Sequence, residues 1–355
     1  MMERKLTRRL TVGNLTLGGG APILIQSMTN VPSEDFDGIY RQVVALEEAG
    51  CDIVRLAVPT TENARIFSYL RSHGVKVPLV ADIHFDYRIA LASMASGADK
   101  IRINPGNIGS RERVSEVARE AKAHHIPIRI GVNAGSLEDS ILRKYGKPSA
   151  EALVESALYH TSLLEECDFF DTCISIKASS VEETIRANRI LSSRVDYPLH
   201  IGVTEAGAGR SSVVKSSIGI GTLLAEGIGD TIRVSLTDNP TEEVEFAKEI
   251  LASLGLYTKG KMDIIACPTC GRTRIDLIAL VDEFERRARS LGLLDRNLKV
   301  ALMGCAVNGP GEARECDIGI AGGKGEGLLF KKGEIQYKVK EDRLVDALIE
   351  EILKM

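Results

Sequence analysis

Short runs of apolar and β-branched residues recur along the first 255 residues, and longer stretches of mixed polarity separate them. Such a run is typical of a buried strand, whereas apolar residues three and four apart are typical of a helix with one buried face. The strand-like runs are Ile23–Met28, Ile53–Val58, Leu79–His84, Lys100–Asn104, Ile128–Val132, Cys173–Lys177, Leu199–Val203 and Thr231–Ser235. Helical spacing occurs in Phe36–Ala49, Glu62–His73, Val181–Ser193, Val213–Glu226 and Glu242–Leu254.

Strands that alternate with helices predict a parallel sheet and an α/β fold. Eight units in about 230 residues fit an N-terminal (β/α)8 TIM barrel. An open doubly wound sheet is the alternative, but its glycine-rich turn follows the first strand, whereas the glycine-rich segment Leu17–Ala21 precedes the first run here. Leu10–Val12 and Leu15–Leu17 flank Gly13-Asn14, which predicts a β-hairpin at the barrel floor.

The alternation ends after Leu254, and we expect a linker at Lys259–Lys261. The chain is therefore predicted to form two domains, a barrel over residues 1–258 and a smaller α/β domain over residues 259–355. The smaller domain is expected to contain helices at Leu277–Ser290 and Asp342–Lys354 and glycine-rich loops at Asn308–Glu312 and Ala321–Gly327.

Composition narrows the possible classes of protein. The 355 residues are 44% hydrophobic and 26% charged, with a net charge of −4, which excludes a disordered chain, a collagen and a disulfide mini-protein. The charge also argues against nucleic-acid binding through bulk positive charge. The chain lacks both an apolar run of about 18 residues and a secretory signal, which predicts no membrane contact and a cytoplasmic location. Seven cysteines, an odd number, argue against a disulfide framework.

In a (β/α)8 barrel the chemistry lies at the carboxyl ends of the strands. Five runs end near a cation, and several end near a carboxylate, an amide or an imidazole. These residues are Arg55, Asp82, His84, Arg102, Asn104, Arg129, Asn133, Lys177, Glu205, Arg233 and Ser235. A ring of cations is costly unless an anion compensates it, and the guanidinium fork matches phosphate oxygens. The pattern favours a small phosphate or diphosphate substrate over five separate surface ion pairs.

Three of these side chains have alternative roles. Lys177 is suited to binding phosphate or to forming a Schiff base, because neighbouring cations favour the neutral amine. His84 fits an acid, a base, a metal ligand or a structural hydrogen-bonding group. Glu205 is a candidate proton donor, because a carboxyl group near a bound anion tends to stay protonated. Alternatively, Glu205 is a counter-ion for Arg233 or Lys177.

Cysteines mark the second domain. Cys267 and Cys270 form a C-x-x-C pair, and Cys305 follows in a glycine-rich segment. Three thiolates in such loops suit zinc or an iron–sulfur cluster, and Cys316 is available as a fourth zinc ligand. A thioredoxin-like disulfide is disfavoured because the surrounding strand–helix pattern is absent, and the radical-SAM cysteine spacing is also absent. The other cysteines, Cys51, Cys167 and Cys173, are expected in the core.

Longer motifs identify a family. Residues 267–272 (CPTCGR) and 303–312 (MGCAVNGPGE) resemble the cluster motifs of the bacterial 4-hydroxy-3-methylbut-2-enyl diphosphate synthases, the reductive enzymes of the non-mevalonate isoprenoid pathway. The resemblance covers nearly the whole chain and lacks the middle domain of the plant form. Barrel segments that resemble the family are Gln26–Thr29, Ala81–Phe85, Ile103–Asn107, Arg129–Asn133 and Thr204–Gly207.

The resemblance implies a [4Fe–4S] cluster held by Cys267, Cys270, Cys305 and Glu312, so that Cys316 is not a ligand. A carboxylate is harder than a thiolate and easier to displace, which leaves one iron able to open to substrate oxygen. The implied reaction is the ring opening and two-electron reductive dehydroxylation of 2-C-methyl-D-erythritol 2,4-cyclodiphosphate to 4-hydroxy-3-methylbut-2-enyl diphosphate. Reduced flavodoxin or ferredoxin is the implied electron donor.

The resemblance also implies roles for the barrel residues. The diphosphate would be bound by Arg55, Arg102, Arg129, Lys177, Arg233 and Ser235. The carbon skeleton and its hydroxyls would contact His84, Asn133, Glu205 and Asn308, with Glu205 as the proton donor. The family is homodimeric, and one subunit's cluster domain closes over the other subunit's barrel, for which a mobile linker near Lys259–Lys261 is suited.

On the residues alone, two other classes stay open. One is a zinc-ribbon protein with a non-redox phosphate-binding barrel, such as a lyase that uses Lys177. The other is a binding module, in which an inactive barrel presents the cysteine domain to a partner. A pterin-binding transferase shares the barrel class but would not need the cysteine domain.

Overall fold

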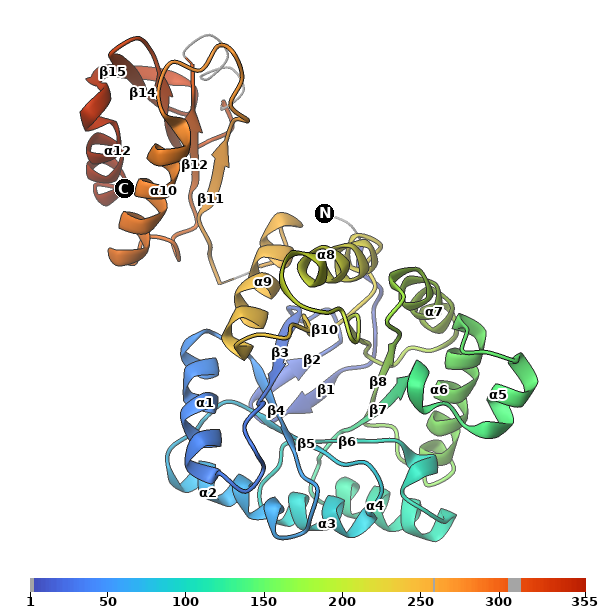
Figure 1. Cartoon of the computed structure of the whole chain (residues 1–355). Coiled ribbons are helices and arrows are strands. Elements are labelled where there is room, and N and C mark those ends of the chain that lie inside the picture. The colour runs from blue at the N-terminus through green and yellow to red at the C-terminus, as the bar shows by residue number, and fades with distance from the viewer. Residues whose placement is uncertain (1–2, 258, 306–313) are drawn as a thin grey trace. The chain divides into compact units, whose positions relative to one another are not determined.

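The computed structural model describes residues 3–257, 259–305 and 314–355, and the chain forms two compact units, Met1–Leu256 and Tyr257–Met355 (Figure 1). Each unit has its own sheet and its own helices. Within the described ranges, no helix combines the length and the apolar character that crossing a membrane requires.

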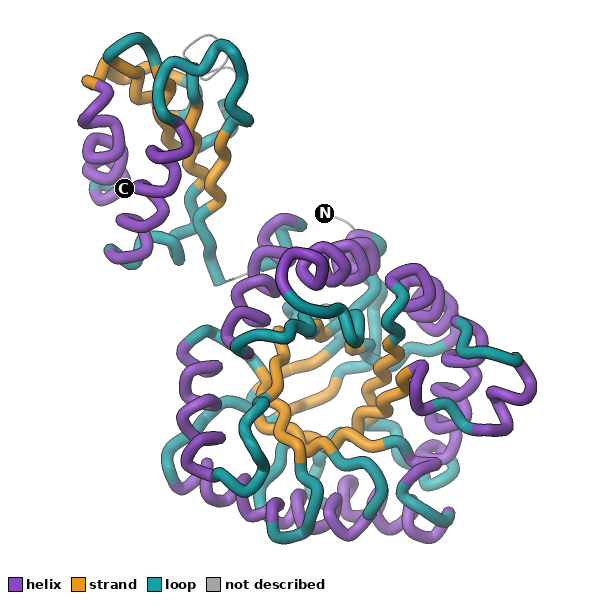
Figure 2. The backbone as a smooth tube through the Cα atoms, viewed as in Figure 1, coloured by secondary structure: helices purple, strands orange, loops and turns teal. Residues whose placement is uncertain are grey.

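The first unit is a ring of parallel strands enclosed by helices (Figure 2). Its strands are β3 (Leu24–Met28), β4 (Ile53–Ala57), β5 (Leu79–Asp82), β6 (Lys100–Ile103), β7 (Ile128–Asn133), β8 (Thr172–Lys177), β9 (His200–Ile201) and β10 (Thr231–Ile232). Their order around the ring is β8-β7-β6-β5-β4-β3-β10-β9, and a bridge between Ile174 and Leu199 closes it. The predicted (β/α)8 barrel is confirmed.

β9 and β10 are shorter than their sequence runs. The extended chain nevertheless continues beyond the paired residues, because the Arg233 N–H still donates to the Ile201 carbonyl at 3.1 Å. The functional residues that follow β10 are therefore held in line with the barrel wall.

The helices of the first unit form the outer layer. They are α1 (Phe36–Glu48), α2 (Ile66–Ser72), α3 (Tyr87–Ala95), α4 (Arg111–Ala123), α5 (Asp139–Tyr145), α6 (Ala150–Glu165), α7 (Val181–Arg194), α8 (Gly209–Ala225) and α9 (Pro240–Ser253). Side chains that accept hydrogen bonds from first-turn N–H groups define several starts: Asp35 for α1, Ser149 for α6, Ser180 for α7 and Asn239 for α9. Such caps satisfy donors that have no partner inside the helix.

The predicted hairpin is formed by β1 (Leu10–Val12) and β2 (Leu15–Leu17). Its apolar side chains pack against residues near the start of several barrel strands, including Leu24, Ile53 and Val80. The hairpin thereby covers the amino-terminal end of the barrel with apolar side chains.

The second unit is a mixed sheet with helices α10 (Leu277–Ser290) and α12 (Leu344–Leu353). Its strands lie in sequence order: β11 (Asp263–Ala266), β12 (Lys299–Met303), β13 (Ile318–Gly322), β14 (Glu326–Lys331) and β15 (Glu334–Lys340). The first three are parallel and the last two are antiparallel to their neighbours. Phe284 of α10 and Leu348 of α12 share one core with Leu302 and Ile320, so both helices pack on the same sheet.

The predicted extent of the glycine-rich loop, Ala321–Gly327, is wrong. Gly322 ends β13 and Gly327 lies in β14, and the two residues are paired across the ladder. A Cβ atom at Gly327 would come within 2.8 Å of the Ala321 carbonyl oxygen. These glycines therefore permit close backbone approach within strands, and only residues 323–325 form the turn. The expected loop at Asn308–Glu312 lies outside the described residues.

Candidate functional site

Five cations meet inside the barrel. Arg55 lies in β4, Arg102 in β6 and Arg129 in β7, while Lys177 ends β8 and Arg233 directly follows β10. Arg102, Arg129 and Lys177 are buried. The other two side chains are only 14% and 18% exposed. The structure thus gathers these predicted residues, although Arg129 lies near the start of its strand and therefore deeper than the strand ends.

Asp82, the last residue of β5, lies between two of the arginines. Its carboxylate is 3.7 Å from Arg55 Nε and 3.3 Å from Arg102 NH1. Burial opposes its ionisation, but Arg55 and then Arg102 outweigh burial, so the pKa of Asp82 lies below its ordinary value. Asp82 is therefore a carboxylate counter-ion of both arginines.

Arg233 has a different partner, Glu243, which the sequence analysis missed. Arg233 donates from Nε and NH2 to the two oxygens of Glu243 at 3.0 and 2.9 Å. Glu243 is buried in the first turn of α9. Its sequence signal is its place in the buried stripe of that helix with Ala247 and Leu251. The alternative in which Glu205 is the counter-ion of Arg233 is wrong, since Glu243 makes this pair.

Arg129 and Lys177 form no ion pair with a carboxylate among the described residues. Arg129 donates weakly to Gln26 Oε1 at 3.5 Å, and its Nε has no hydrogen-bond partner in the described chain. Burial, followed by Arg55 and Arg102, lowers the pKa of Arg129 well below its ordinary value. Burial, followed by Arg233 and Arg129, does the same to the pKa of Lys177. These charges are costly until an anion enters.

A sulfur atom contacts two of the guanidinium groups. Met28 ends β3, and its Sδ accepts from Arg55 Nε and NH2 at 3.0 and 2.8 Å. Arg233 NH1 approaches the same sulfur at 3.9 Å. A thioether is a weak acceptor, so these donors keep capacity for a stronger one.

Two more titratable side chains lie inside the barrel, and the sequence analysis missed both. Lys100 is fully buried, its Nζ has no hydrogen-bond partner among the described residues, and burial lowers its pKa to about 8. His200 Nδ1 is 2.6 Å from Thr231 Oγ1. Burial, followed by Lys177 and Arg129, lowers the pKa of His200 well below its ordinary value. Lys100 lies two residues before Arg102 on the same strand face, which is the sequence signal for it.

The remaining predicted residues, apart from Asn104, are more accessible. His84 and Glu205 are exposed, Asn133 and Ser235 are half-buried, and Asn104 is buried. Asn133 ends β7 opposite Lys177, which ends β8. These side chains therefore belong to the opening of the barrel, while the cations form its interior.

Glu205 has an unusual backbone, with φ of +51°. This left-handed conformation is costly for a residue with a side chain and is commonly found where function requires it. Its carboxylate makes no ion pair with a described cation.

Three of the four cysteines of the second unit lie at the edge of its sheet where the parallel strands end, called the cysteine edge below. Cys267 directly follows β11, Cys305 comes soon after β12, and these strands are parallel neighbours. Gly304 N–H donates to Cys267 Sγ at 3.2 Å. Thr273 N–H donates to the Cys270 carbonyl, and Arg274 N–H donates to the Gly304 carbonyl, both at 3.0 Å. The C-x-x-C loop therefore folds over the end of β12.

This edge suits a thiolate-bound cluster in its donor chemistry. Cys267, Cys270 and Cys305 form no disulfide, and backbone N–H groups that donate to sulfur are typical of iron–sulfur sites. The described residues do not hold three such ligands at metal-binding distance. The predicted ligand Glu312 and the predicted substrate contact Asn308 lie outside the described residues.

Cys316 lies at the opposite edge, where the parallel strands begin. It precedes β13 and is buried with Ala301, Ala321 and Phe330. Because β12 and β13 are parallel, a whole strand length separates Cys316 from Cys305, roughly 15 Å at the usual rise per residue. The zinc alternative with Cys316 as fourth ligand is therefore disfavoured by the fold.

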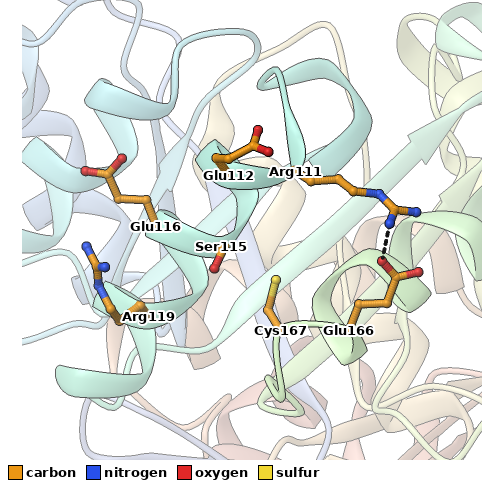
Figure 3. Close-up of a pocket in the computed structure, with 7 residues that line it drawn as sticks. All are labelled: Arg111, Glu112, Ser115, Glu116, Arg119, Glu166 and Cys167. Carbon is orange, nitrogen blue, oxygen red and sulfur yellow. Dashed lines mark ion pairs between the residues drawn. The ribbon is translucent and has the colours of Figure 1, made fainter.

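A surface hollow lies elsewhere, on the outer helices of the barrel (Figure 3). It is lined by α4 residues and by Glu166 and Cys167, and an ion pair of 3.4 Å joins Arg111 to Glu166. It shares no residue with the buried cations. Its charged side chains are of both signs and mostly exposed, and they give no reason to assign it a ligand.

Family models match both units of the chain. One, described as the GcpE TIM-barrel domain, matches residues 7–248. Another, described as the GcpE protein C-terminal domain, matches residues 263–354. Together they span the barrel cations and the cysteine edge.

Curated relatives match the full length of the chain. A Clostridium acetobutylicum protein named 4-hydroxy-3-methylbut-2-en-1-yl diphosphate synthase (flavodoxin) is 57% identical over 354 residues, which cover 100% of both chains. A Symbiobacterium thermophilum protein of the same name is 56% identical over 350 residues, 99% of this chain and 93% of that protein.

Solved structures of lower identity share the fold. The N-acetylneuraminic acid synthetase of Leptospira borgpetersenii has a TM-score of 0.52 at 13% identity, over 82% of this chain and 99% of that one. The type I 3-dehydroquinate dehydratase of Clostridium difficile has a TM-score of 0.50 at 15% identity, over 70% and 98%. At such identities the likeness concerns the fold alone.

Proposed function

The chain belongs to the GcpE family of enzymes, and on that basis we propose that it converts 2-C-methyl-D-erythritol 2,4-cyclodiphosphate to 4-hydroxy-3-methylbut-2-enyl diphosphate in isoprenoid biosynthesis. The curated relatives carry the name of the enzyme that makes this product. The conversion breaks the ring C–O bond to the diphosphate, takes up two electrons and releases one hydroxyl as water.

The excess of buried positive charge carries the proposal. Arg129 and Lys177 have no carboxylate partner among the described residues, and burial and neighbouring cations lower the pKa of both. Asp82 and Glu243 offset only part of the charge of the surrounding arginines. A diphosphate supplies the missing negative charge together with oxygen atoms that match guanidinium forks.

We assign diphosphate binding to the cations and to the serine that follows them. Negative charge develops on the diphosphate as its C–O bond breaks, and donors that are already oriented and desolvated stabilise that charge without reorganisation. The residues assigned are Arg55, Arg102, Arg129, Lys177, Arg233 and Ser235.

We propose that the carbon skeleton of the substrate binds at the opening of the barrel. Glu205 would donate a proton, and the accessibility and strained backbone of this residue support a role at the reacting end. His84 and Asn133 would contact the hydroxyls of the substrate. Asn308 is assigned to the same hydroxyls on the family resemblance alone.

The proposal includes a [4Fe–4S] cluster held by Cys267, Cys270, Cys305 and Glu312. The free thiols and the Gly304 N–H donated to Cys267 Sγ support thiolate ligation. When bound, such a cluster supplies the electrons one at a time. The chain's own residues hold the diphosphate, exclude water from the barrel and provide the proton.

The name shared by the relatives supports reduced flavodoxin as the electron donor, with ferredoxin as the alternative carrier. We further propose a homodimer in which one subunit's cluster domain completes the other subunit's barrel. This arrangement rests on the family resemblance.

The test uses protein purified without oxygen. We expect it to contain about four irons per chain, as the proposed cluster requires, and to form the allylic diphosphate from the cyclic diphosphate and reduced flavodoxin, as measured by mass spectrometry. Cys305→Ala should lose iron and turnover. Cys316→Ala is the matched control, since it removes a buried thiol at the other edge of the sheet, and it should keep both.

Other outcomes would redirect the assignment. Stoichiometric zinc without iron, after attempted iron–sulfide reconstitution, would overturn the cluster. Borohydride trapping of a substrate adduct on Lys177 would favour a Schiff-base lyase in the same barrel. Iron retained by Cys305→Ala would remove that residue from the ligand set.

A further inference from the structure

Glu243 connects three elements around one arginine of the barrel. Its Oε1 accepts from Arg233 NH2 at 2.9 Å and from the Leu236 N–H at 3.2 Å. Its Oε2 accepts from Arg233 Nε at 3.0 Å and from Ser27 Oγ at 2.8 Å. Each oxygen therefore has two donors, and the donors come from β3 and from the segment after β10 while the carboxylate comes from α9.

These contacts fix the plane of the guanidinium. Two parallel hydrogen bonds to one carboxylate leave Arg233 little freedom to rotate. They occupy Nε and NH2, so NH1 stays available and meets only Met28 Sδ at 3.9 Å among the described residues. The Leu236 bond also anchors the segment that contains Ser235.

We infer that Glu243 is a positioning residue that aims Arg233 NH1, together with the Ser235 segment, at the diphosphate. The inference rests on the proposed function, because it takes the anion to be the ligand of Arg233. Glu243 itself does not touch the anion. It acts through the arginine and through the backbone of Leu236.

A simple counter-charge is the competing explanation. Burial and the neighbouring arginines lower the pKa of Lys177 and of Arg55. The negative charge of Glu243 partly opposes this lowering in both residues. If Glu243 were only a counter-charge, its neutralisation would make the barrel more positive and would tighten anion binding. If it positions Arg233, its neutralisation should weaken anion binding. The two explanations differ in sign.

The experiment compares Glu243→Gln with Glu242→Gln in the full-length holoenzyme. Glu242 is the exposed neighbour on α9, so the control removes the same charge without the buried contacts. We expect Glu243→Gln to weaken binding of inorganic pyrophosphate and to raise KM by about 10- to 100-fold, as misplaced binding groups do. The effect on kcat should be smaller, and Glu242→Gln should change binding less than about twofold, as an exposed charge does.

A double variant tests the route through Arg233. Arg233→Met should weaken pyrophosphate binding by itself, and adding Glu243→Gln to it should change binding by less than about twofold, because coupled residues are not additive. Ser27→Ala keeps every charge and removes one donor to Glu243. It should weaken binding by about fivefold, and it serves as the second test if Glu243→Gln does not fold.

The outcomes separate the inference from its premise. Tighter or unchanged pyrophosphate binding in Glu243→Gln, with weaker binding in Arg233→Met, would overturn the role of Glu243 and keep the proposed function. Unchanged binding in Arg233→Met would overturn both the inference and the assignment of Arg233 to the diphosphate.

Discussion

Two single residues in this barrel are held in a conformation or in surroundings that cost free energy of folding. Glu205 has a left-handed backbone, and Lys100 is a buried amine whose Nζ has no hydrogen-bond partner among the described residues. Both costs reduce the stability of the ligand-free protein. Each can therefore be tested by a substitution that improves stability while it removes a functional group.

Glu205→Gly should stabilise the protein and strongly reduce turnover. Glycine adopts positive φ freely, and the gain after its larger loss of entropy on folding is about 0.5 to 1 kcal/mol. Loss of the proposed proton donor should lower kcat by at least about 100-fold. His125→Gly is the matched control, since His125 is also left-handed, with φ of +54°, and lies in an exposed turn. It should show the same gain in the free energy of unfolding, measured by urea denaturation, with unchanged turnover.

Lys100→Met should stabilise the protein at neutral pH. The pKa of Lys100 is lowered from 10.5 to about 8 in the folded protein. Between these values the unfolded chain binds a proton that the folded chain does not, so this group makes stability rise with pH across that window. Below it, the full penalty applies, on the order of 3 kcal/mol. The variant should recover this free energy of unfolding at pH 7.

The control for Lys100 is Lys76→Met, because Lys76 is exposed. Urea denaturation at pH 7 and near pH 10 should show a difference between wild type and Lys100→Met that shrinks as pH rises. A difference independent of pH would indicate improved packing and would show that the buried amine of Lys100 does not cause it.

The place of the five cations near the ends of the strand-like runs predicted that they come together, because the carboxyl ends of barrel strands meet at one mouth. The partner of Arg233 was not predictable in the same way. Glu243 comes from a helix, and only its place in the buried stripe distinguishes it from the exposed Glu242. Which carboxylate pairs with a cation depends on tertiary packing, and no local pattern specifies it.

At the scale of elements, β7 is shaped to receive a side chain from β6. Gly131 lies beside the guanidinium of Arg102, which donates from NH2 to the Gly131 carbonyl at 3.1 Å. A Cβ atom at position 131 would come within 2.3 Å of Arg102 Nε. The absence of a side chain on one strand therefore sets the position of a cation on the next.

Gly131→Ala should displace Arg102 and weaken diphosphate binding. We expect KM to rise by about tenfold or more, because a displaced guanidinium can no longer donate to two oxygens of the diphosphate at once. Gly135→Ala is the matched control, since a Cβ atom there meets nothing within 4 Å. The test is to measure KM for both variants with the same substrate preparation. Equal values would contradict the proposed contact between Arg102 and the diphosphate.

Elements of the second unit were predicted unevenly. The periodicity of α10 predicted its bounds, because one face of that helix is apolar. The segment at Ala321–Gly327 was predicted as a loop because it is rich in glycine, yet most of it belongs to strands. Glycine indicates close backbone approach as readily as a turn, and the sequence alone does not distinguish the two.

At the scale of the whole molecule, the chain consists of two units with separate cores. Leu302, Ile320 and Leu348 belong to the core of the second unit, while the barrel buries its own apolar residues. Units with separate cores commonly unfold separately. The proposed diphosphate residues belong to one unit and the proposed cluster ligands to the other.

Calorimetry of the full-length protein should therefore show two unfolding transitions that respond to different ligands. Saturating pyrophosphate should raise the barrel transition by about 5 °C and leave the other unchanged. Cys305→Ala should lower only the transition of the second unit, because loss of a structural metal destabilises the domain that holds it. A single transition that shifts as a whole in both experiments would show that the units unfold together.

The contact between Met28 and two guanidinium groups has a consequence for oxidative damage. Oxidation of the thioether to a sulfoxide adds an oxygen that is a much stronger acceptor than sulfur. That oxygen would occupy donors of Arg55 and Arg233 that are proposed to bind the diphosphate. We expect peroxide-treated enzyme to keep a raised KM after its iron and sulfide are restored, and methionine sulfoxide reductase to reverse it. Met28→Leu should be resistant, which would locate this loss of substrate affinity in the barrel and not at the proposed cluster.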